Sequence, residues 1–210
     1  MPIIAANKGT HHEPIPAGNY VARCFQMIQI GTVEENIMGT MKILNKVRLG
    51  FELPTETKVF KEEHGEQPFV ISKEFTLSLH EKATLRKMLE SWRGKGFTED
   101  QAKSFDITVL AEKPCMLNII HKPSKDGSKV YAEISSISSM PKGLQCPPQV
   151  NPTVILSYDN FNDEIFNSLP DFIKDKMKKS TEYHNMTNPD LTEDKVTGTT
   201  EPEDTDDLPF

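Results

Sequence analysis

Residues 67–93 read QPFVISKEFTLSLHEKATLRKMLESWR, and the spacing of hydrophobic residues changes within this stretch. From Phe69 to Leu79 every second residue is apolar except Lys73, which is the pattern of a β-strand with one buried face. Four apolar residues then recur at helical spacing: Leu85, Met88, Leu89 and Trp92. This spacing predicts an amphipathic helix over 81–93. The stretch therefore predicts a strand followed by one helix.

Alternating hydrophobic residues on either side predict further strands. The predicted order is strand 19–29, strand 41–53, a ribbon over 57–79, helix 81–93, a short helix from Thr98, a strand beginning near Cys115, and strand 128–140. Residues 31–39 are expected to form a polar connection. Five short strands with one helix between the third and fourth fit the OB-fold, a partly open five-stranded Greek-key barrel. The predicted fold class is mainly β, because strands and helices do not alternate as they do in α/β proteins.

Composition divides the chain into four parts. These are an irregular lead-in at 1–17, an OB-fold domain at 18–145, a Pro-rich linker with one short helix at 146–182, and a disordered acidic tail at 183–210. The short helix follows Pro170 and is predicted to carry Phe172, Ile173 and Met177 on one side. Beyond Tyr183 hydrophobic residues are scarce, which favours disorder.

The charge differs sharply between these parts. Residues 1–145 contain 19 Lys and Arg against 17 Asp and Glu, a net charge of +2, whereas residues 146–210 contain 5 against 14, a net charge of −9. Such an asymmetry indicates separate roles for the body and the tail. A net charge of +2 is ordinary for a body of this size, so charge alone does not identify a ligand.

Several classes of protein are disfavoured. The sequence lacks an apolar run of about 18 residues and a secretory signal, so neither a membrane span nor secretion is expected. The three cysteines are far apart in sequence, which favours a reducing, cytoplasmic environment without disulfides or a zinc site. Common catalytic motifs such as GxxxxGK[ST], GxSxG and HExxH are absent, so we expect no enzyme activity and no cofactor or metal.

A barrel of this kind can bind a single nucleic-acid strand when cations follow the phosphates and aromatic rings stack on the bases. The candidate cations are Arg23, Lys42, Lys46, Arg48, Lys58, Lys61 and Lys73, and the candidate aromatics are Tyr20, Phe60, Phe69 and Tyr131. Lys42, Lys46 and Arg48 share one face of strand 41–53 and form a stripe about 20 Å long. Lys and Arg on a strand also serve simply as solvated surface, so the prediction depends on the whole set.

The chain ends in EPEDTDDLPF, residues 201–210, in which five of ten residues are acidic and the last three are Leu-Pro-Phe. An apolar pocket on a partner can hold Phe210 while basic residues bind its carboxylate. Pro209 limits the entropy lost on docking. The predicted partner-binding residues are Asp206, Asp207, Leu208, Pro209 and Phe210.

This ending resembles the acidic tip of bacterial and phage single-stranded DNA-binding proteins. The body resembles a phage-encoded group of these proteins in four stretches: KVRLGFELP (46–54), ISKEFTLSLHEKA (71–83), SWRGKGFT (91–98) and YAEISSISSMPKG (131–143). The resemblance implies an OB domain that binds the strand, a flexible linker, and a tip that recruits replication and repair proteins. Leu208 departs from the family, in which this position is usually β-branched.

Two functions follow from these observations. The first is sequence-independent binding and protection of single-stranded DNA during phage replication or recombination, in the cytoplasm of the host, with recruitment of partner proteins through the tip. The second is a non-catalytic adaptor whose OB-like barrel binds another protein and whose acidic tail solubilises it or mimics DNA. The number of subunits is left open, and a homo-oligomer is compatible with either function.

Overall fold

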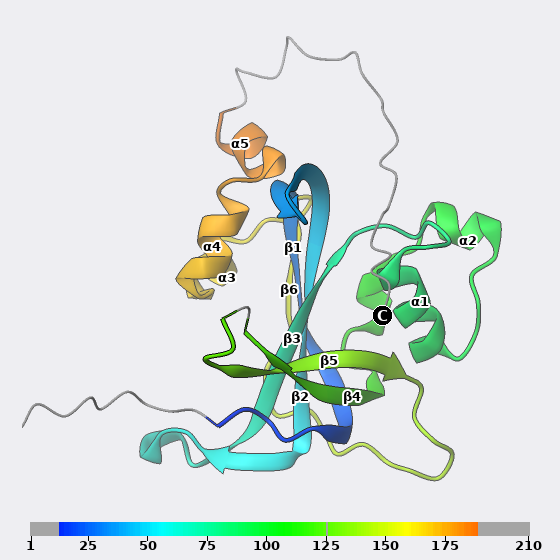
Figure 1. Cartoon of the computed structure of the whole chain (residues 1–210), viewed down its shortest axis with the longest axis vertical. Coiled ribbons are helices and arrows are strands. Elements are labelled where there is room, and N and C mark those ends of the chain that lie inside the picture. The colour runs from blue at the N-terminus through cyan, green and yellow to red at the C-terminus, as the bar shows by residue number, and fades with distance from the viewer. Residues whose placement is uncertain (1–12, 125, 189–210) are drawn as a thin grey trace, which may run out of the picture.

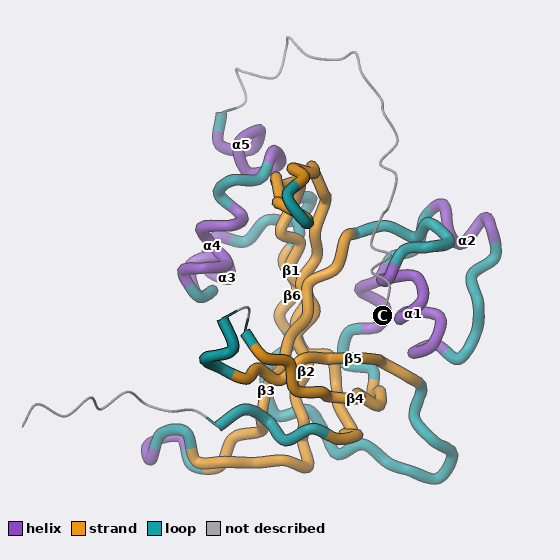
Figure 2. Tube along the Cα trace, in the orientation of Figure 1, coloured by secondary structure: helices purple, strands orange, loops and turns teal. Residues whose placement is uncertain are grey.

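The computed structural model describes residues 13–124 and 126–188, and the chain is mainly β, as predicted (Figures 1 and 2). The strands are β1 Gly18–Ile37, β2 Thr40–Val59, β3 Glu66–Thr76, β4 Pro114–Pro123, β5 Val130–Ser138 and β6 Val154–Leu156. The helices are α1 Thr84–Arg93, α2 Glu99–Lys103, α3 Asp163–Ser168, α4 Asp171–Met177 and α5 Thr181–Thr187, with 3-10 turns at Glu62–His64 and Ile107–Leu110. None of the described helices is long and apolar enough to cross a membrane.

The strands form one sheet in the order β3-β2-β1-β4-β5, with β6 added parallel to β1 and all other pairs antiparallel. Three consecutive antiparallel strands followed by a fourth that returns beside the first make a Greek key. The barrel is not closed, because β3 and β5 lie at the two ends of this order and do not pair. Lys73 connects the two strands across this opening: its Nζ lies 2.6 Å from the carbonyl oxygen of Ile134 and 3.1 Å from Glu133 Oε1.

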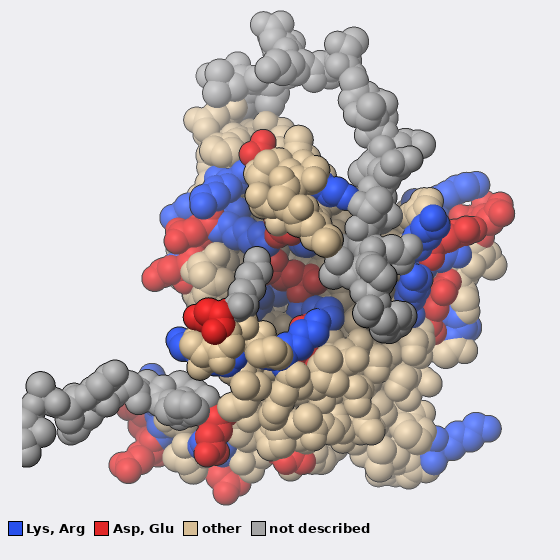
Figure 3. All heavy atoms as spheres, in the orientation of Figure 1, with Lys and Arg blue, Asp and Glu red and all other residues tan. Residues whose placement is uncertain are grey.

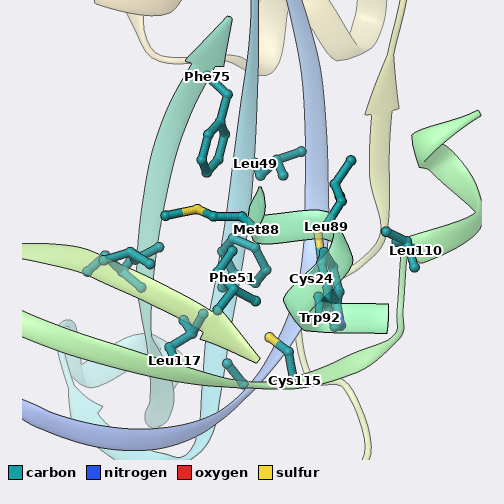
Figure 4. Close-up of a cluster of buried hydrophobic side chains, with 14 of the residues drawn as sticks. Cys24, Leu49, Phe51, Phe75, Met88, Leu89, Trp92, Leu110, Cys115 and Leu117 are labelled. Carbon is teal, nitrogen blue, oxygen red and sulfur yellow. The ribbon is translucent and has the colours of Figure 1, made fainter. Parts of the chain in front are cut away.

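The main core lies between the strands and α1 (Figure 4). All four residues of the predicted apolar stripe of α1 are buried, which confirms the helical spacing. Trp92 packs against Phe51 with 5.7 Å between ring centroids, and its indole N–H donates to the Pro114 carbonyl at 2.9 Å. Gly94 ends the helix in the left-handed conformation, with a φ of 68°. The helix thus ties β2 to the start of β4.

The hairpin of β1 and β2 is longer than the sequence predicts. Residues 31–39, expected to be a polar connection, belong mostly to β1, and the turn falls at Met38 and Gly39, which both have positive φ. Polar residues continue the strand here because tertiary partners stabilise it: Val33 is buried and Glu35 pairs with two lysines. Irregular pairing near Cys24 and again near Gly31 lets β1 present apolar residues to both sides.

A second hydrophobic cluster lies on the other face of β1. Its buried members are Ile28, Ile30, Val33, Leu156, Phe166, Leu169, Ile173 and Met177. The segment predicted as a Pro-rich linker with one short helix at 146–182 contains that helix, α4, and also β6 and α3, and the boundary placed at Tyr183 falls inside α5. Helices of six or seven residues are not stable alone, so their formation depends on packing against β1, which the local sequence does not reveal. We call residues 150–187 the C-terminal module.

Polar contacts fix the C-terminal module to the sheet. Glu52 on β2 is fully buried and accepts hydrogen bonds at 2.8 Å from the backbone N–H groups of Val150 and Asn151. Glu182 of α5 accepts from the backbone and hydroxyl of Thr32 at 2.6 and 2.8 Å. Glu52 in particular resists displacement, because a buried charge that loses its hydrogen-bond donors is costly. The module is consequently anchored at both ends.

Candidate nucleic-acid interface

The structure divides the eleven predicted DNA-binding residues into two sets. Seven are half-buried: Tyr20, Arg23, Lys42, Lys46, Arg48, Phe69 and Lys73. Four are exposed: Lys58, Phe60, Lys61 and Tyr131. A side chain that binds phosphate or base has to reach solvent, so the exposed set is the stronger candidate. Alternation along a strand does not separate the two sets, because it reports the face of the strand but not what covers that face.

Arg23 holds the chain that follows β5. Its guanidinium donates to the backbone carbonyls of Glu112 at 2.7 Å, Pro147 at 2.8 Å and Cys146 at 3.2 Å. These three acceptors come from two loops that are distant in sequence. Because its donors are already used, Arg23 has a structural role that the sequence pattern did not predict.

The predicted cationic stripe is part of a network of ion pairs. Lys46 pairs with Glu35 at 2.9 Å and Arg48 with Glu74 at 3.2 Å, and Lys176 of α4 joins the two pairs by contacting both Glu35 and Glu74. In Figure 3, basic and acidic side chains are intermixed around the C-terminal helices rather than gathered in one basic surface. The carboxylates come from β1 and β3, and the extra lysine from α4. Glu35 of β1 and Glu74 of β3 therefore neutralise much of the positive charge that the sequence predicts for this strand.

Protonation in this network favours the charged forms. Burial by itself raises the pKa of Glu35, but hydrogen bonds from Lys176 and Lys46 outweigh it and leave the pKa below its ordinary value. Burial likewise lowers the pKa of Lys176, but its two carboxylate partners outweigh that effect and raise the pKa. Both shifts favour the charged forms of Glu35 and Lys176.

Lys73 and Phe69 lie on the side of β3 that carries the core residues. Lys73 connects β3 to β5, and its partner Glu133 is shared with Lys122 at 2.9 Å. Burial raises the pKa of Glu133, but hydrogen bonds from Lys122 and Lys73 lower it further than burial raises it. Phe69 packs against the main core, as does Tyr20, whose hydroxyl donates to the Pro16 carbonyl at 2.8 Å. Lys73 thus stabilises the open side of the barrel, whereas Phe69 and Tyr20 contribute to the main core.

The exposed candidates lie on two hairpins whose turns both lie at the left of Figure 1. Lys58 and Lys61 flank Phe60 at the end of the β2–β3 hairpin, where the Phe60 ring is 47% exposed and meets Phe69 edge to face at 5.3 Å. Tyr131 is 54% exposed on β5 and lies opposite Lys122 in the register of the β4–β5 hairpin. Each hairpin therefore presents one aromatic ring beside cations. This is the residue chemistry that binds a single strand.

One exposed aromatic was assigned wrongly from the sequence. Phe172 was predicted to lie on the same side of its helix as Ile173 and Met177. Those two residues are buried, but Phe172 is 60% exposed, and its ring centroid lies 5.3 Å from Cζ of Arg48. Helical spacing predicts this difference, because residues three or four apart share one face of a helix. Ile173 and Met177 are four residues apart, whereas Phe172 is five residues from Met177 and lies on another face.

Two further predictions concern ligands beyond the hairpins. In the part of the chain that the structure describes, no three His, Cys, Asp or Glu side chains are grouped so that they could hold a metal ion. The predicted partner-binding tip, Asp206, Asp207, Leu208, Pro209 and Phe210, lies outside the described residues.

Comparison with known proteins gives no match, whether with protein-family models, with curated proteins or with solved structures. The function proposed below depends on the residues and their geometry.

Proposed function

We propose that this chain is a non-catalytic protein that binds single-stranded DNA without sequence preference, and that its body is an OB-type barrel. The Greek-key strand order, the helix between β3 and β4, and a barrel that stays open between β3 and β5 support the fold assignment. The resemblance of the chain end to single-stranded DNA-binding proteins supports the function. The protein would coat exposed strands during phage DNA replication or recombination in the host cytoplasm.

The observation that carries the proposal is the pair of hairpins with exposed aromatics. Phe60 lies between Lys58 and Lys61 in sequence, and Tyr131 lies opposite Lys122, which is paired with Glu133 but keeps 58% of its side chain exposed. Stacking accepts every base and phosphate contacts ignore sequence, so this set favours a sequence-tolerant ligand. A duplex hides the faces of its bases, and we expect it to bind more weakly.

The test is a fluorescence titration of the full chain with a labelled poly-dT oligonucleotide over a series of salt concentrations, with a duplex for comparison. We expect the double variant Lys58→Glu, Lys61→Glu to bind weakly and to show a shallower salt dependence, by about 0.7 in the log–log slope for each phosphate that is no longer bound. The matched control is Lys95→Glu, Lys103→Glu, which changes the net charge equally at exposed positions around α2. Equal losses of affinity in both variants would mean that the cations of the β2–β3 hairpin are not part of the site.

Failure of the wild type to bind poly-dT even at low salt would contradict the proposal as a whole and favour the adaptor function. Phe60→Ala gives a separate check: it should weaken binding by removing a stacking ring and leave the salt slope unchanged. An unaltered affinity in this variant would remove Phe60 from the interface.

The acidic tip is proposed to recruit replication or recombination proteins. Deleting residues 201–210 should leave the affinity for DNA unchanged or raise it, because five carboxylates no longer compete with the strand. The same deletion should abolish capture of a helicase, primase or nuclease in a pull-down. Loss of DNA binding on deletion would contradict this division of roles.

A further inference from the structure

A groove of about 870 Å³ separates the far half of the β1–β2 hairpin from helices α4 and α5, which lie beside that hairpin in Figure 1. Met41 and Ile43 line it from β2, and Phe172, Lys176 and Lys179 line it from α4 and the residues after it. The volume is in the range of small-molecule sites, and apolar and polar side chains both face it. None of the eleven candidates discussed above lines this groove.

Phe172 is held in place without belonging to either hydrophobic cluster. Its ring lies over Arg48, whose guanidinium is fixed by Glu74 at 3.2 Å and by the Ser72 hydroxyl. Arg48 is therefore a rigid support beneath the ring. Because the residue remains 60% exposed, most of its surface is available to a ligand. Exposing an aromatic ring to water is energetically unfavourable. A ring that is both exposed and held in one orientation can stack on a planar ligand.

The remaining lining explains which ligand fits. Met41 and Ile43 are 59% and 66% exposed, so the groove has an apolar wall opposite the ring. Lys179 is exposed and has no ion pair among the described residues, whereas Lys176 is already shared by two carboxylates. His184, Glu34 and Asp175 also line the groove, so its charge is nearly balanced. Stacking, more than charge, would dominate binding here.

We propose that this groove is a second contact for the bound strand, in which a base stacks on Phe172 and Lys179 contacts an adjacent phosphate. The inference rests on the proposed function and extends it, because it assigns part of the DNA-binding surface to the C-terminal module. An aromatic ring, an apolar wall and a single available cation match a nucleotide better than an acidic peptide, which would need several available cations.

Phe172→Trp tests stacking directly. The chain has a single tryptophan, Trp92, which is 4% exposed in the main core and should respond little to a ligand. The added indole at the groove should be quenched when poly-dT is titrated into the full-length variant, with the same midpoint as the labelled-oligonucleotide titration. Unchanged emission at saturating poly-dT would overturn the proposal.

Affinity measurements give an independent test. We expect Phe172→Ala to weaken poly-dT binding roughly tenfold without changing the salt slope, as expected when one base is no longer stacked. Lys179→Glu should also weaken binding, whereas Lys178→Glu, a matched charge change at an exposed neighbour that does not line the groove, should have a smaller effect. Thermal unfolding of all variants should match the wild type, since the three side chains are exposed.

The outcomes separate this inference from the proposed function. If the hairpin variant loses affinity but Phe172→Ala and Lys179→Glu bind as tightly as wild type, the groove is not part of the DNA site, while the proposed function stands. If Phe172→Ala instead changes only self-association or capture of a protein, the groove is a protein interface and the inference is wrong. If wild type does not bind poly-dT, both fail.

Discussion

The main core and the second hydrophobic cluster lie on opposite faces of β1, and they differ in how they are held together. The main core contains 21 buried residues from β1 to β5, α1 and neighbouring loops, whereas the second cluster contains eight, from β1, β6, α3, α4 and the residue after α3. The smaller cluster is supplemented by specific polar contacts: Tyr158 donates to the Ile30 carbonyl at 3.0 Å, and Glu52 and Glu182 bind backbone N–H groups. Because the second cluster buries little apolar surface, hydrogen bonds help to fix the C-terminal module on the sheet.

This difference predicts two levels of stability in one chain. The barrel should unfold as a unit, whereas the C-terminal module should open at lower free energy because it buries less apolar surface. Four measurements test this comparison, from the largest effect to the smallest.

The largest effect is expected at Phe51 in the main core. Phe51→Ala leaves a cavity beside Trp92 and should lower the free energy of unfolding by about 3–5 kcal/mol. Denaturant unfolding followed by the fluorescence of Trp92 measures this loss. A loss below about 1 kcal/mol would mean that the core collapses around the site.

Met177 is the corresponding position in the second cluster, with no exposed surface. Met177→Ala should cost about 2–5 kcal/mol, but the loss should appear mainly as opening of the C-terminal module. Hydrogen exchange should show faster exchange in α3, α4 and α5 while the amides of β4 and β5 keep their protection. Equal acceleration throughout would show that the two clusters unfold together.

Gly31 lies where β1 passes close to the start of α5. Its φ is +91°, and an added Cβ would lie 2.7 Å from atoms of Ser180 and Glu182. Gly31→Ala should therefore destabilise the module by about 1–3 kcal/mol. Gly39→Ala is the control, because Gly39 has a φ of +89° with no atoms within 4 Å of the added Cβ. The difference in melting temperature isolates the contact with α5, and no difference would contradict it.

The smallest effect is the pH dependence of the ion-pair network. Since the folded-state pKa of Glu35 is below its ordinary value of 4.5, its pairing stabilises the fold above that pH and is lost as the pH falls through the folded pKa. Exchange protection of α4 should therefore fall between about pH 5 and pH 3. Glu35→Gln should flatten this dependence and lower stability at neutral pH by less than about 1 kcal/mol. If exchange protection of α4 in Glu35→Gln falls with pH as it does in the wild type, other carboxylates control the opening of the C-terminal module.

The parts of the fold that were predicted correctly are those with a long local pattern. The stripe of α1 and the alternation in β3 are set by each segment's own contact with one core, so spacing alone reveals them. In β5 the buried residues Ile134 and Ile137 are three positions apart, so strict alternation did not describe that strand. Thr98 was also predicted to begin a helix, and it forms a capping box with Gln101. The far end of β1 and helices α3 and α5 were missed because their stability comes from packing on one another, through residues more than 100 positions apart, whereas α4 was predicted to follow Pro170.

The candidate site was predictable only in part for the same reason. Residue chemistry identified Lys58, Phe60, Lys61 and Tyr131, which the structure leaves exposed. It could not show that Glu35, Glu74 and Lys176 would surround Lys46 and Arg48, because these five residues come together from four elements. Phe172 was named, but its place over Arg48 is set by how α4 docks on the sheet.

The two-faced strand β1 also sets an order of events during synthesis. Ile28, Ile30 and Val33 leave the ribosome early, but α3 and α4, which cover them, are made about 130 residues later. At 5–20 residues per second, one face of β1 stays uncovered for on the order of ten seconds. During that interval the nascent chain exposes an apolar strand, the kind of segment that chaperones bind and that drives misassembly. The solubility of the nascent chain therefore depends on the synthesis of α3 and α4 as well as on the folding of the barrel.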